Sequence, residues 1–365
     1  MADAGHAAIN FGLAEAPSYH GGMTKTVDVL GTTHTYELTA ATGSDCLVFV
    51  HGWLLSRGYW RPLIQHLQED YRCLLYDLRG FGESQMPGGG RLADPTESLG
   101  AAPAGLGLLS SSGDRGDDRC GDGDRSSGNH GSGKSSDGDN AEPQDTAPST
   151  RYSPAAYAQD LVQLLEALNI ERAWVVGHSL GGSIGLWAAI QAPKRICGCI
   201  CVNSGGGIYL KEEFETFRNV GRQLVRLRPK WLRRLPFLDM AMARMNVARP
   251  LQRRWGRQRL LDLLAADAEA AMGSLLDSTT EQEVHRLPHV VSHLAQPVYF
   301  VAGAQDDIME PKYVKHLASF HRLFCETGEN VIELEDCGHF AMLEQPDALA
   351  ATVRSILQRH PDARP

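Results

Sequence analysis

Residues 175–182 of this chain, VVGHSLGG, decide its fold. An apolar run ends in Gly-x-Ser-x-Gly, and a predicted helix of small and apolar residues follows at once. This pattern is typical of a sharp strand-to-helix turn that holds one side chain above a sheet. The small flanking residues are needed because strand and helix approach closely there and because the turn residue has a strained backbone. The stretch therefore predicts that Ser179 is a nucleophile.

The composition is that of a globular chain with one unusual segment. The 365 residues carry a net charge of −9, and they suffice for one large domain with an insertion. Residues 87–150 contain eleven acidic and five basic residues, so they contribute −6 and leave −3 for the remainder. No apolar run approaches the roughly 20 residues that span a bilayer, and residues 1–22 lack a secretory signal. We expect a cytoplasmic location, with organelle targeting left open.

The eight cysteines do not form a disulfide framework in a chain of this size, which favours a reducing compartment. Cys197, Cys199 and Cys201 alternate within one predicted strand, which would place all three on one face. Because no histidine or further cysteine flanks them, a buried apolar row is favoured over a metal site. No glycine loop of the phosphate-binding kind is present. We expect no metal and no cofactor.

The chain alternates predicted strands with amphipathic helices, which indicates an α/β fold with a mostly parallel sheet. Strands are predicted at 24–30, 33–39, 46–50, 73–76, 196–202, 298–301 and 331–334, and a further strand with Val175 and Val176 leads into the turn at Ser179. Helices are predicted at 58–68, from Pro154 behind an N-terminal cap at Ser153, and directly after Ser179.

The predicted organisation has four parts. They are a flexible tail at 1–22, a core at 23–86, 151–204 and 291–360, a low-complexity insertion at 87–150, and a helical cap at 205–290 broken at Pro229, Pro236 and Pro250. The insertion is rich in Gly, Ser, Asp and Pro and cannot bury enough apolar surface to order itself. A tolerated expansion at an exposed site is favoured over a regulatory or partner-binding loop.

A serine hydroxyl needs a base within hydrogen-bond reach, and the base is usually a histidine oriented by a carboxylate. Asp306 and His339 each follow a predicted strand, where α/β sheets keep their active sites. The chain order Ser179, Asp306, His339 is the expected one, with Asp307 as the alternative acid. The backbone N–H groups of Leu180 and Trp53 are the predicted oxyanion donors.

Five motifs stand in one order along the chain: HGW (51–53), DLRGFGES (77–84), GHSLGG (177–182), GxxD (303–306) and GHF (338–340). In this the chain resembles the α/β-hydrolase superfamily, in its group of cap-bearing serine hydrolases. The resemblance implies an α/β-hydrolase fold with a helical cap insertion. It also implies Ser179 as nucleophile, His339 as base and then acid, and Asp306 as the orienting carboxylate.

Other motif residues have structural or binding interpretations. Relatives that open epoxides or displace halide carry Asp where this chain has Ser179 and often Pro where it has Leu54, which counts against both activities. His51 is expected to brace the oxyanion loop, and Asp77 and Arg79 to pair with each other or with backbone amides. His178 and Trp53 are candidates for substrate contact.

The cap is unusually basic. Residues 211–259 hold fourteen basic and four acidic residues, interleaved with Trp and Met. A solvated basic face over an apolar cap core is favoured, and peripheral docking on anionic lipid is the alternative. Nucleic-acid binding is not expected, since no recognition motif accompanies the charge.

The predicted function is a serine hydrolase that cleaves the carboxylic ester of a small-molecule substrate. The Met- and Trp-rich cap favours a medium-to-large hydrophobic acyl or alcohol part, with a lipid-like ester as one candidate. Thioester, lactone or carbon–carbon bond hydrolysis and acyl transfer on the same triad stay open, because cap shape and water access separate them. A non-catalytic ligand-binding protein on this fold is the alternative from a different class.

Overall fold

The computed structural model describes residues 22–39, 46–84, 151–205, 211–328 and 330–363. The chain divides into two units, one formed by residues 1–89 and 148–365 and the other by residues 90–147. All described residues belong to the first unit. Residues 1–21 of the tail predicted at 1–22 and the whole insertion predicted at 87–150 lie outside the described residues.

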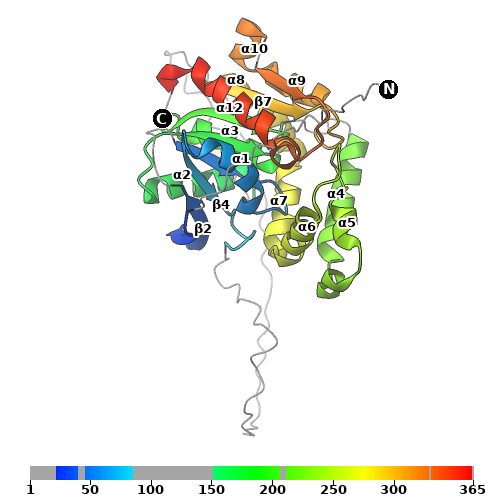
Figure 1. The fold of residues 1–365 in the computed structure, drawn as a ribbon. Coiled ribbons are helices and arrows are strands. Elements are labelled where there is room, and N and C mark those ends of the chain that lie inside the picture. Colours follow the sequence, from blue (N-terminus) through cyan, green and yellow to red (C-terminus); the bar gives the residue numbers. More distant parts are fainter. Residues whose placement is uncertain (1–21, 40–45, 85–150, 206–210, 329, 364–365) are drawn as a thin grey trace, which may run out of the picture. The chain divides into compact units, whose positions relative to one another are not determined.

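The described part of the first unit contains one eight-stranded sheet in the order β1-β2-β4-β3-β5-β6-β7-β8 (Figure 1). The strands are β1 (Lys25–Val29), β2 (Thr32–Leu38), β3 (Cys46–Val50), β4 (Arg72–Tyr76), β5 (Ala173–His178), β6 (Ile196–Val202), β7 (Val298–Gly303) and β8 (Val331–Leu334). The β1–β2 and β2–β4 pairs are antiparallel, and every other pair is parallel. The predicted α/β class with a mostly parallel sheet is confirmed.

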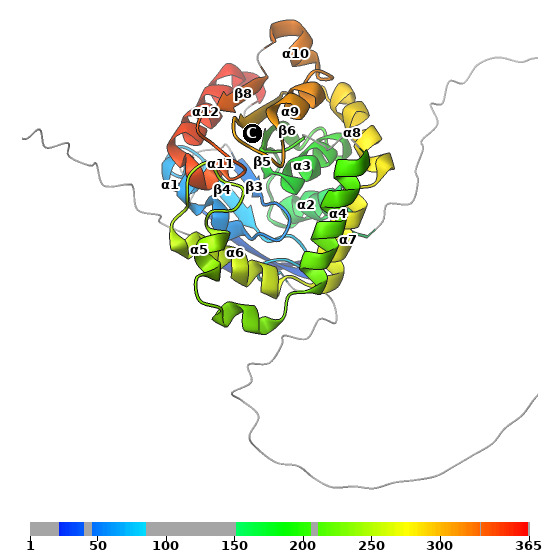
Figure 2. The ribbon, with the colours of Figure 1, turned by 90° about the vertical axis from the view of Figure 1, so that its right-hand side faces the viewer.

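Helices cover both faces of the sheet, as the apolar central strands require. One buried layer includes side chains of α2 (Pro154–Ala167), α3 (Leu180–Gln191), α8 (Glu281–His293) and α9 (Pro311–Ala318). The other includes side chains of α1 (Arg61–Leu67), α11 (Ala341–Glu344) and α12 (Pro346–Arg359). Figure 2 shows α1 and α12 on one side of the strands and α2, α3 and α8 on the other.

The sequence signals predicted for the start of α2 are confirmed. The Ser153 hydroxyl accepts a hydrogen bond from the Ala156 N–H, and Pro154 occupies the first helical position of α2. The helix predicted at 58–68 is divided into a 3₁₀ turn, η1 (Arg57–Trp60), and α1.

The segment predicted as a cap, residues 205–290 and called the cap below, is helical in its described residues, with interruptions near Pro229, Pro236 and Pro250. It contains α4 (Lys211–Arg226), η2 (Lys230–Arg234), α5 (Leu238–Met242), α6 (Arg253–Ala265) and α7 (Ala268–Ser278). The last residues of the predicted cap, 281–290, belong to α8. This helix contributes the buried side chains of Val290 and Val291 to a core layer against the sheet. The remaining described helices are α10 (Arg322–Thr327) and the 3₁₀ turn η3 (Pro361–Ala363).

The three cysteines of β6 do not share one face, so that prediction is wrong. Ala173 of β5 pairs with Ile196, but the next residue, Trp174, pairs with Gly198, so Cys197 is an extra residue in the ladder. Such a β-bulge shifts the side-chain alternation by one. Cys197 packs in the layer of α1 and α12, whereas Cys199 and Cys201 pack in the layer of α3. All three are buried free thiols, and burial raises the pKa of Cys199 to about 12.

Candidate active site

Ser179 stands between β5 and α3 in a backbone conformation that few residues adopt. Its φ is 52° and its ψ is −120°, a sparsely populated region that proteins retain at functional turns. The flanking glycines make the turn feasible. A Cβ on Gly177 would lie 2.2 Å from the Gly181 carbonyl oxygen, and one on Gly181 would lie 2.2 Å from the Val50 carbonyl oxygen. The sequence therefore builds a strained turn that holds Ser179 at the carboxyl end of β5.

Asp306 and His339 form a buried pair at the ends of the neighbouring strands β7 and β8. The Nδ1 atom of His339 lies 2.9 Å from Oδ2 and 3.1 Å from Oδ1 of Asp306. The Asp306 carboxylate also accepts hydrogen bonds from the N–H groups of Ile308 (2.9 Å) and Met309 (3.0 Å). Burial alone would raise the pKa of Asp306, but the attraction of His339 and these hydrogen bonds lower it to about 2.

Because Asp306 stays ionised, it accepts and cannot donate, so the proton on this side of the ring belongs to Nδ1 of His339. Neutral His339 then has its lone pair on Nε2, the atom that a general base uses. In the part of the chain that the structure describes, no hydrogen bond joins the Ser179 hydroxyl to His339. Catalytic hydrogen bonds often tighten only when substrate is bound.

His178 connects the nucleophile turn to the histidine loop. Its ring is 1% exposed, its Nε2 donates to the His339 carbonyl oxygen at 2.7 Å, and the two ring centroids are 4.8 Å apart. Burial and the nearby His339 lower the pKa of His178 to about 3, so the ring is neutral. The contact that the structure shows is thus to the histidine loop, and the substrate contact expected of His178 stays a prediction.

Asn203 is a site residue that the sequence analysis did not assign. It follows β6, is fully buried, and has a φ of 46°. Its Nδ2 donates to Oδ2 of Asp306 (2.9 Å) and to the Gly338 carbonyl oxygen (3.0 Å), and its Oδ1 accepts from the Ala341 N–H (3.3 Å). One amide side chain therefore fixes both the acid and the loop that carries the histidine. Its position at the carboxyl end of a central strand is the signal that points to it.

The two predicted oxyanion donors flank the nucleophile turn. Leu180 is the first residue of α3, and the first N–H groups of a helix have no acceptor within it. Trp53 follows Gly52 in the loop after β3, and a Cβ on Gly52 would lie 3.2 Å from the Ser179 Cβ. The Trp53 indole N–H donates to the Ala271 carbonyl oxygen of α7 at 2.9 Å, which fixes this half-buried side chain against the cap.

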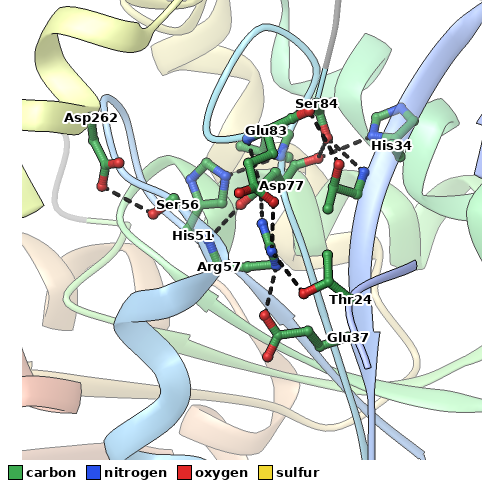
Figure 3. A network of polar contacts seen from close by, with 12 residues as sticks. Thr24, His34, Glu37, His51, Ser56, Arg57, Asp77, Glu83, Ser84 and Asp262 are labelled. Atoms are coloured by element: carbon green, nitrogen blue, oxygen red, sulfur yellow. Dashed lines mark hydrogen bonds and ion pairs between the residues drawn. The ribbon is translucent and has the colours of Figure 1, made fainter. Parts of the chain in front are cut away.

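A network of polar contacts holds the loop that contains Trp53 (Figure 3). The buried Arg57 contacts Glu37 (2.9 Å), Asp77 and Glu83 (2.8 Å), and the Asp77 carboxylate accepts from the Arg57 N–H at 2.7 Å. His51 accepts from the Leu78 N–H at its Nε2, and its Nδ1–H donates to the Gly52 carbonyl oxygen. The loop is therefore braced from the turn after β4.

Of the two alternatives predicted for Asp77 and Arg79, pairing with backbone amides is confirmed for Asp77, and the ion pairs of the described residues include none between the two. Asp77 pairs with Arg57 and with backbone amides, whereas Arg79 lies 3.4 Å from Asp160 and donates to the Arg151 carbonyl oxygen. Arg57 is adjacent to neither in sequence, and only the packing of the loop after β3 on the turn after β4 brings it there.

Backbone contacts join the cap to the histidine loop. The His339 N–H donates to the Asn246 carbonyl oxygen at 2.9 Å. The Glu344 carboxylate accepts from the N–H groups of Gly338 (3.0 Å), Phe340 (3.0 Å) and, in the cap, Ala248 (2.8 Å). One carboxylate therefore holds both sides of the boundary between cap and core.

Among the described residues, no group of three or more His, Cys, Asp and Glu side chains is arranged to hold a metal ion. Among the same residues, no helix is both long and apolar enough to cross a membrane.

The family model of the alpha/beta hydrolase family matches residues 47–352. This chain therefore belongs to the alpha/beta hydrolase family, and the resemblance inferred from its five motifs is confirmed. An uncharacterised protein of Mycobacterium tuberculosis is 30% identical over 227 residues, which cover 56% of this chain and 61% of that protein. The chain thus spans less than two thirds of the length of that relative.

Solved structures share the fold at low sequence identity. An esterase from Thermogutta terrifontis matches with a TM-score of 0.60 and 18% identity, over 93% of this chain and 99% of that one. An enol-lactonase from Burkholderia xenovorans matches with a TM-score of 0.59 and 18% identity, over 92% of this chain and 100% of that one. At this identity the likeness concerns the fold alone.

Proposed function

We propose that this protein is a serine hydrolase that cleaves a carboxylic ester through a triad of Ser179, His339 and Asp306. The observation that carries the proposal is that two features occur together at the carboxyl ends of the parallel strands. Ser179 occupies a strained turn with a φ of 52°, and the His339 ring there is oriented by a buried, ionised carboxylate 2.9 Å away. A nucleophile with a base oriented by a third group is the arrangement that acyl transfer needs.

In the proposed reaction, the Ser179 oxygen attacks the acyl carbon while Nε2 of His339 takes the hydroxyl proton. The N–H groups of Trp53 and Leu180 stabilise the oxyanion of the tetrahedral intermediate. His339 then gives its proton to the leaving alcohol, and an acyl-enzyme remains. Water loses a proton to His339 and attacks the acyl carbon. When this second tetrahedral intermediate collapses, His339 returns the proton to the departing Ser179 oxygen, and the carboxylic acid is released.

The proposed substrate is a small molecule with a hydrophobic acyl or alcohol part. Support comes from the aromatic Trp53 side chain, which lies next to the nucleophile turn and is held against α7 of the cap. A lactone is the second candidate, because the fold is shared with an enol-lactonase and a lactone is a cyclic ester open to the same attack.

A fluorophosphonate probe tests the nucleophile. We expect the wild-type chain to be labelled and Ser179→Ala to lose the label, while Ser183→Ala, one turn along α3, keeps it. Absence of labelling of the folded wild-type chain would contradict the proposal and favour a non-catalytic binding protein.

A substrate panel then separates the chemistries. Open-chain esters from acetate to palmitate, a thioester and a lactone are compared on the wild-type chain and on Ser179→Ala. Turnover that is highest on longer esters and depends on Ser179 supports the proposal. A strict preference for acetate would exclude the hydrophobic substrate, and turnover of the lactone alone would make the second candidate the function.

A further inference from the structure

Exposed apolar side chains gather in one part of the cap. Among the described residues, seven of the twelve large hydrophobic side chains that are exposed lie between residues 220 and 245. They are Val220, Leu224, Leu227, Trp231, Leu235, Phe237 and Met245, and we call residues 220–245 the cap patch. Leu227 is 72% exposed, Phe237 68% and Trp231 57%. Figure 1 shows the helices α4 and α5 of this segment on the same side of the core.

The helix α4 has apolar residues on two faces. Gly221 and Val225 are buried on the face toward α7, where a Cβ on Gly221 would lie 2.6 Å from Leu275. Val220 and Leu224, with Leu227 just after the helix, recur at the three-to-four spacing of a second face, and all three are exposed. A helix that only covers a core carries polar residues on its outer face. The outer face of α4 is therefore suited to a further contact.

The same segment carries almost only positive charge. Residues 216–261 hold thirteen basic residues and one acidic residue, Asp239. That acid is already paired with Arg253. Arg226, Lys230, Arg233 and Arg234 are exposed, and the ion pairs formed among the described residues include none of them. The charge and the exposed apolar side chains thus occur in the same short stretch.

We propose that the cap patch docks on the surface of an anionic lipid bilayer. In this contact Leu227, Trp231 and Phe237 enter the boundary between headgroups and acyl chains, and the basic residues between them reach lipid phosphates. Basic residues interleaved with Leu, Trp and Phe are typical of segments that lie in the membrane interface. A nucleic acid would use the charge but leave the apolar side chains in water. The docking does not involve Ser179, so it stands independently of the proposed hydrolase activity.

Binding of the full-length chain to lipid vesicles tests the proposal. The partition coefficient is measured with phosphatidylcholine vesicles and with vesicles that contain about 30% phosphatidylserine, where we expect much tighter binding. Each basic residue near an anionic surface contributes about 1 kcal/mol, so Arg233→Gln with Arg234→Gln should weaken binding about 30-fold. Leu227→Ser with Trp231→Ser should weaken it at least about tenfold.

Matched changes outside the cap serve as controls. Leu30 and Lys194 are an exposed apolar and an exposed basic residue of the core, and Leu30→Ser with Lys194→Gln should bind vesicles like the wild type. Circular dichroism melts establish that each variant is folded, and an unfolded double variant is replaced by its two single variants.

Three results would overturn the proposal. One is equal binding to the two kinds of vesicle, and another is an equal loss in the control variant. The third is that the wild-type chain does not bind either kind of vesicle. This result would overturn the proposal even if the patch variants abolished dimerisation of the chain or its binding to duplex DNA.

Discussion

Replacing Asn203 by Ala tests whether one buried amide holds the acid and the histidine loop together. The change leaves the Gly338 carbonyl oxygen and the Ala341 N–H without their Asn203 partner, and Asp306 loses one donor. A buried polar group left without a partner costs about 1–3 kcal/mol. Alanine at the φ of 46° adds about 1 kcal/mol, because a Cβ disfavours this region. With two such polar groups, we therefore expect the free energy of unfolding to fall by about 3–7 kcal/mol.

The same change should slow the reaction more than it weakens substrate binding. With Asn203 removed, the Asp306 carboxylate and the His339 loop are no longer fixed to each other, and a small misplacement of catalytic groups costs up to about 100-fold in rate. We expect kcat on a p-nitrophenyl ester to fall by about 10- to 100-fold with KM nearly unchanged. Urea unfolding and steady-state kinetics measure the two effects.

Asn203→Gly separates the lost hydrogen bonds from the backbone strain. Glycine adopts positive φ freely, so this variant should be about 1 kcal/mol more stable than Asn203→Ala with an equal loss of kcat. If Asn203→Ala lost less than about 0.5 kcal/mol and kept its kcat, the assignment of Asn203 as a positioning residue would be refuted. A stability loss with unchanged kcat would reduce its role to folding.

Three other changes test the site and its supports. The pKa of Asp306 is about 2 when folded, below its ordinary unfolded value, so its stabilisation is full above about pH 4 and is lost as the pH falls toward 2. This amounts to about 2 kcal/mol in acid unfolding curves, and Asp306→Asn should lack this pH-dependent part. Arg57→Met leaves Asp77 buried without its cation and removes one of the two cations that Glu37 contacts, the other being Arg61. It should cost about 3–5 kcal/mol in urea unfolding, whereas Arg354→Met, at a more exposed pair, should cost less than about 1 kcal/mol. Similar losses would argue against a buried network. Gly181→Ala places a Cβ 2.2 Å from the Val50 carbonyl oxygen and should lower the melting temperature sharply. The control Gly58→Ala, whose Cβ would come no closer than 4.0 Å to Ser56, should leave the melting temperature nearly unchanged. Equal melting temperatures of the two variants would contradict the close approach at Gly181.

The sequence predicts what depends on local or repeated signals. The turn at Ser179 is recognisable because its glycines recur at fixed positions in a short motif, where a Cβ would meet the backbone of the turn itself (Gly177) or of the neighbouring strand β3 (Gly181). The parallel strands are recognisable because burial on both faces leaves a continuous apolar run, as in β3. The order of Ser179, Asp306 and His339 follows from where strands end, and the structure places Asp306 and His339 within hydrogen-bond distance.

The features that escaped the sequence depend on contacts between distant segments. Cys197 leaves the face of its neighbours because the ladder to β5 slips by one residue there, and no alternation pattern within β6 shows this. Arg57 and Asp77 lie in two different segments that pack together. Asparagine is common in loops, so its residue type does not distinguish Asn203. Such contacts are set by the packing of the sheet ends, which one sequence does not reveal.

Three of the contacts that attach the cap to the catalytic loops use main-chain groups of the cap. The carbonyl oxygens of Asn246 and Ala271 and the N–H of Ala248 are the partners of His339, Trp53 and Glu344. Main-chain groups are the same whatever the side chain, so a new side chain at Ala248 or Ala271 leaves these hydrogen bonds available. The cap can therefore change side chains at such positions, as a new substrate would require, while these links to the catalytic loops stay in place.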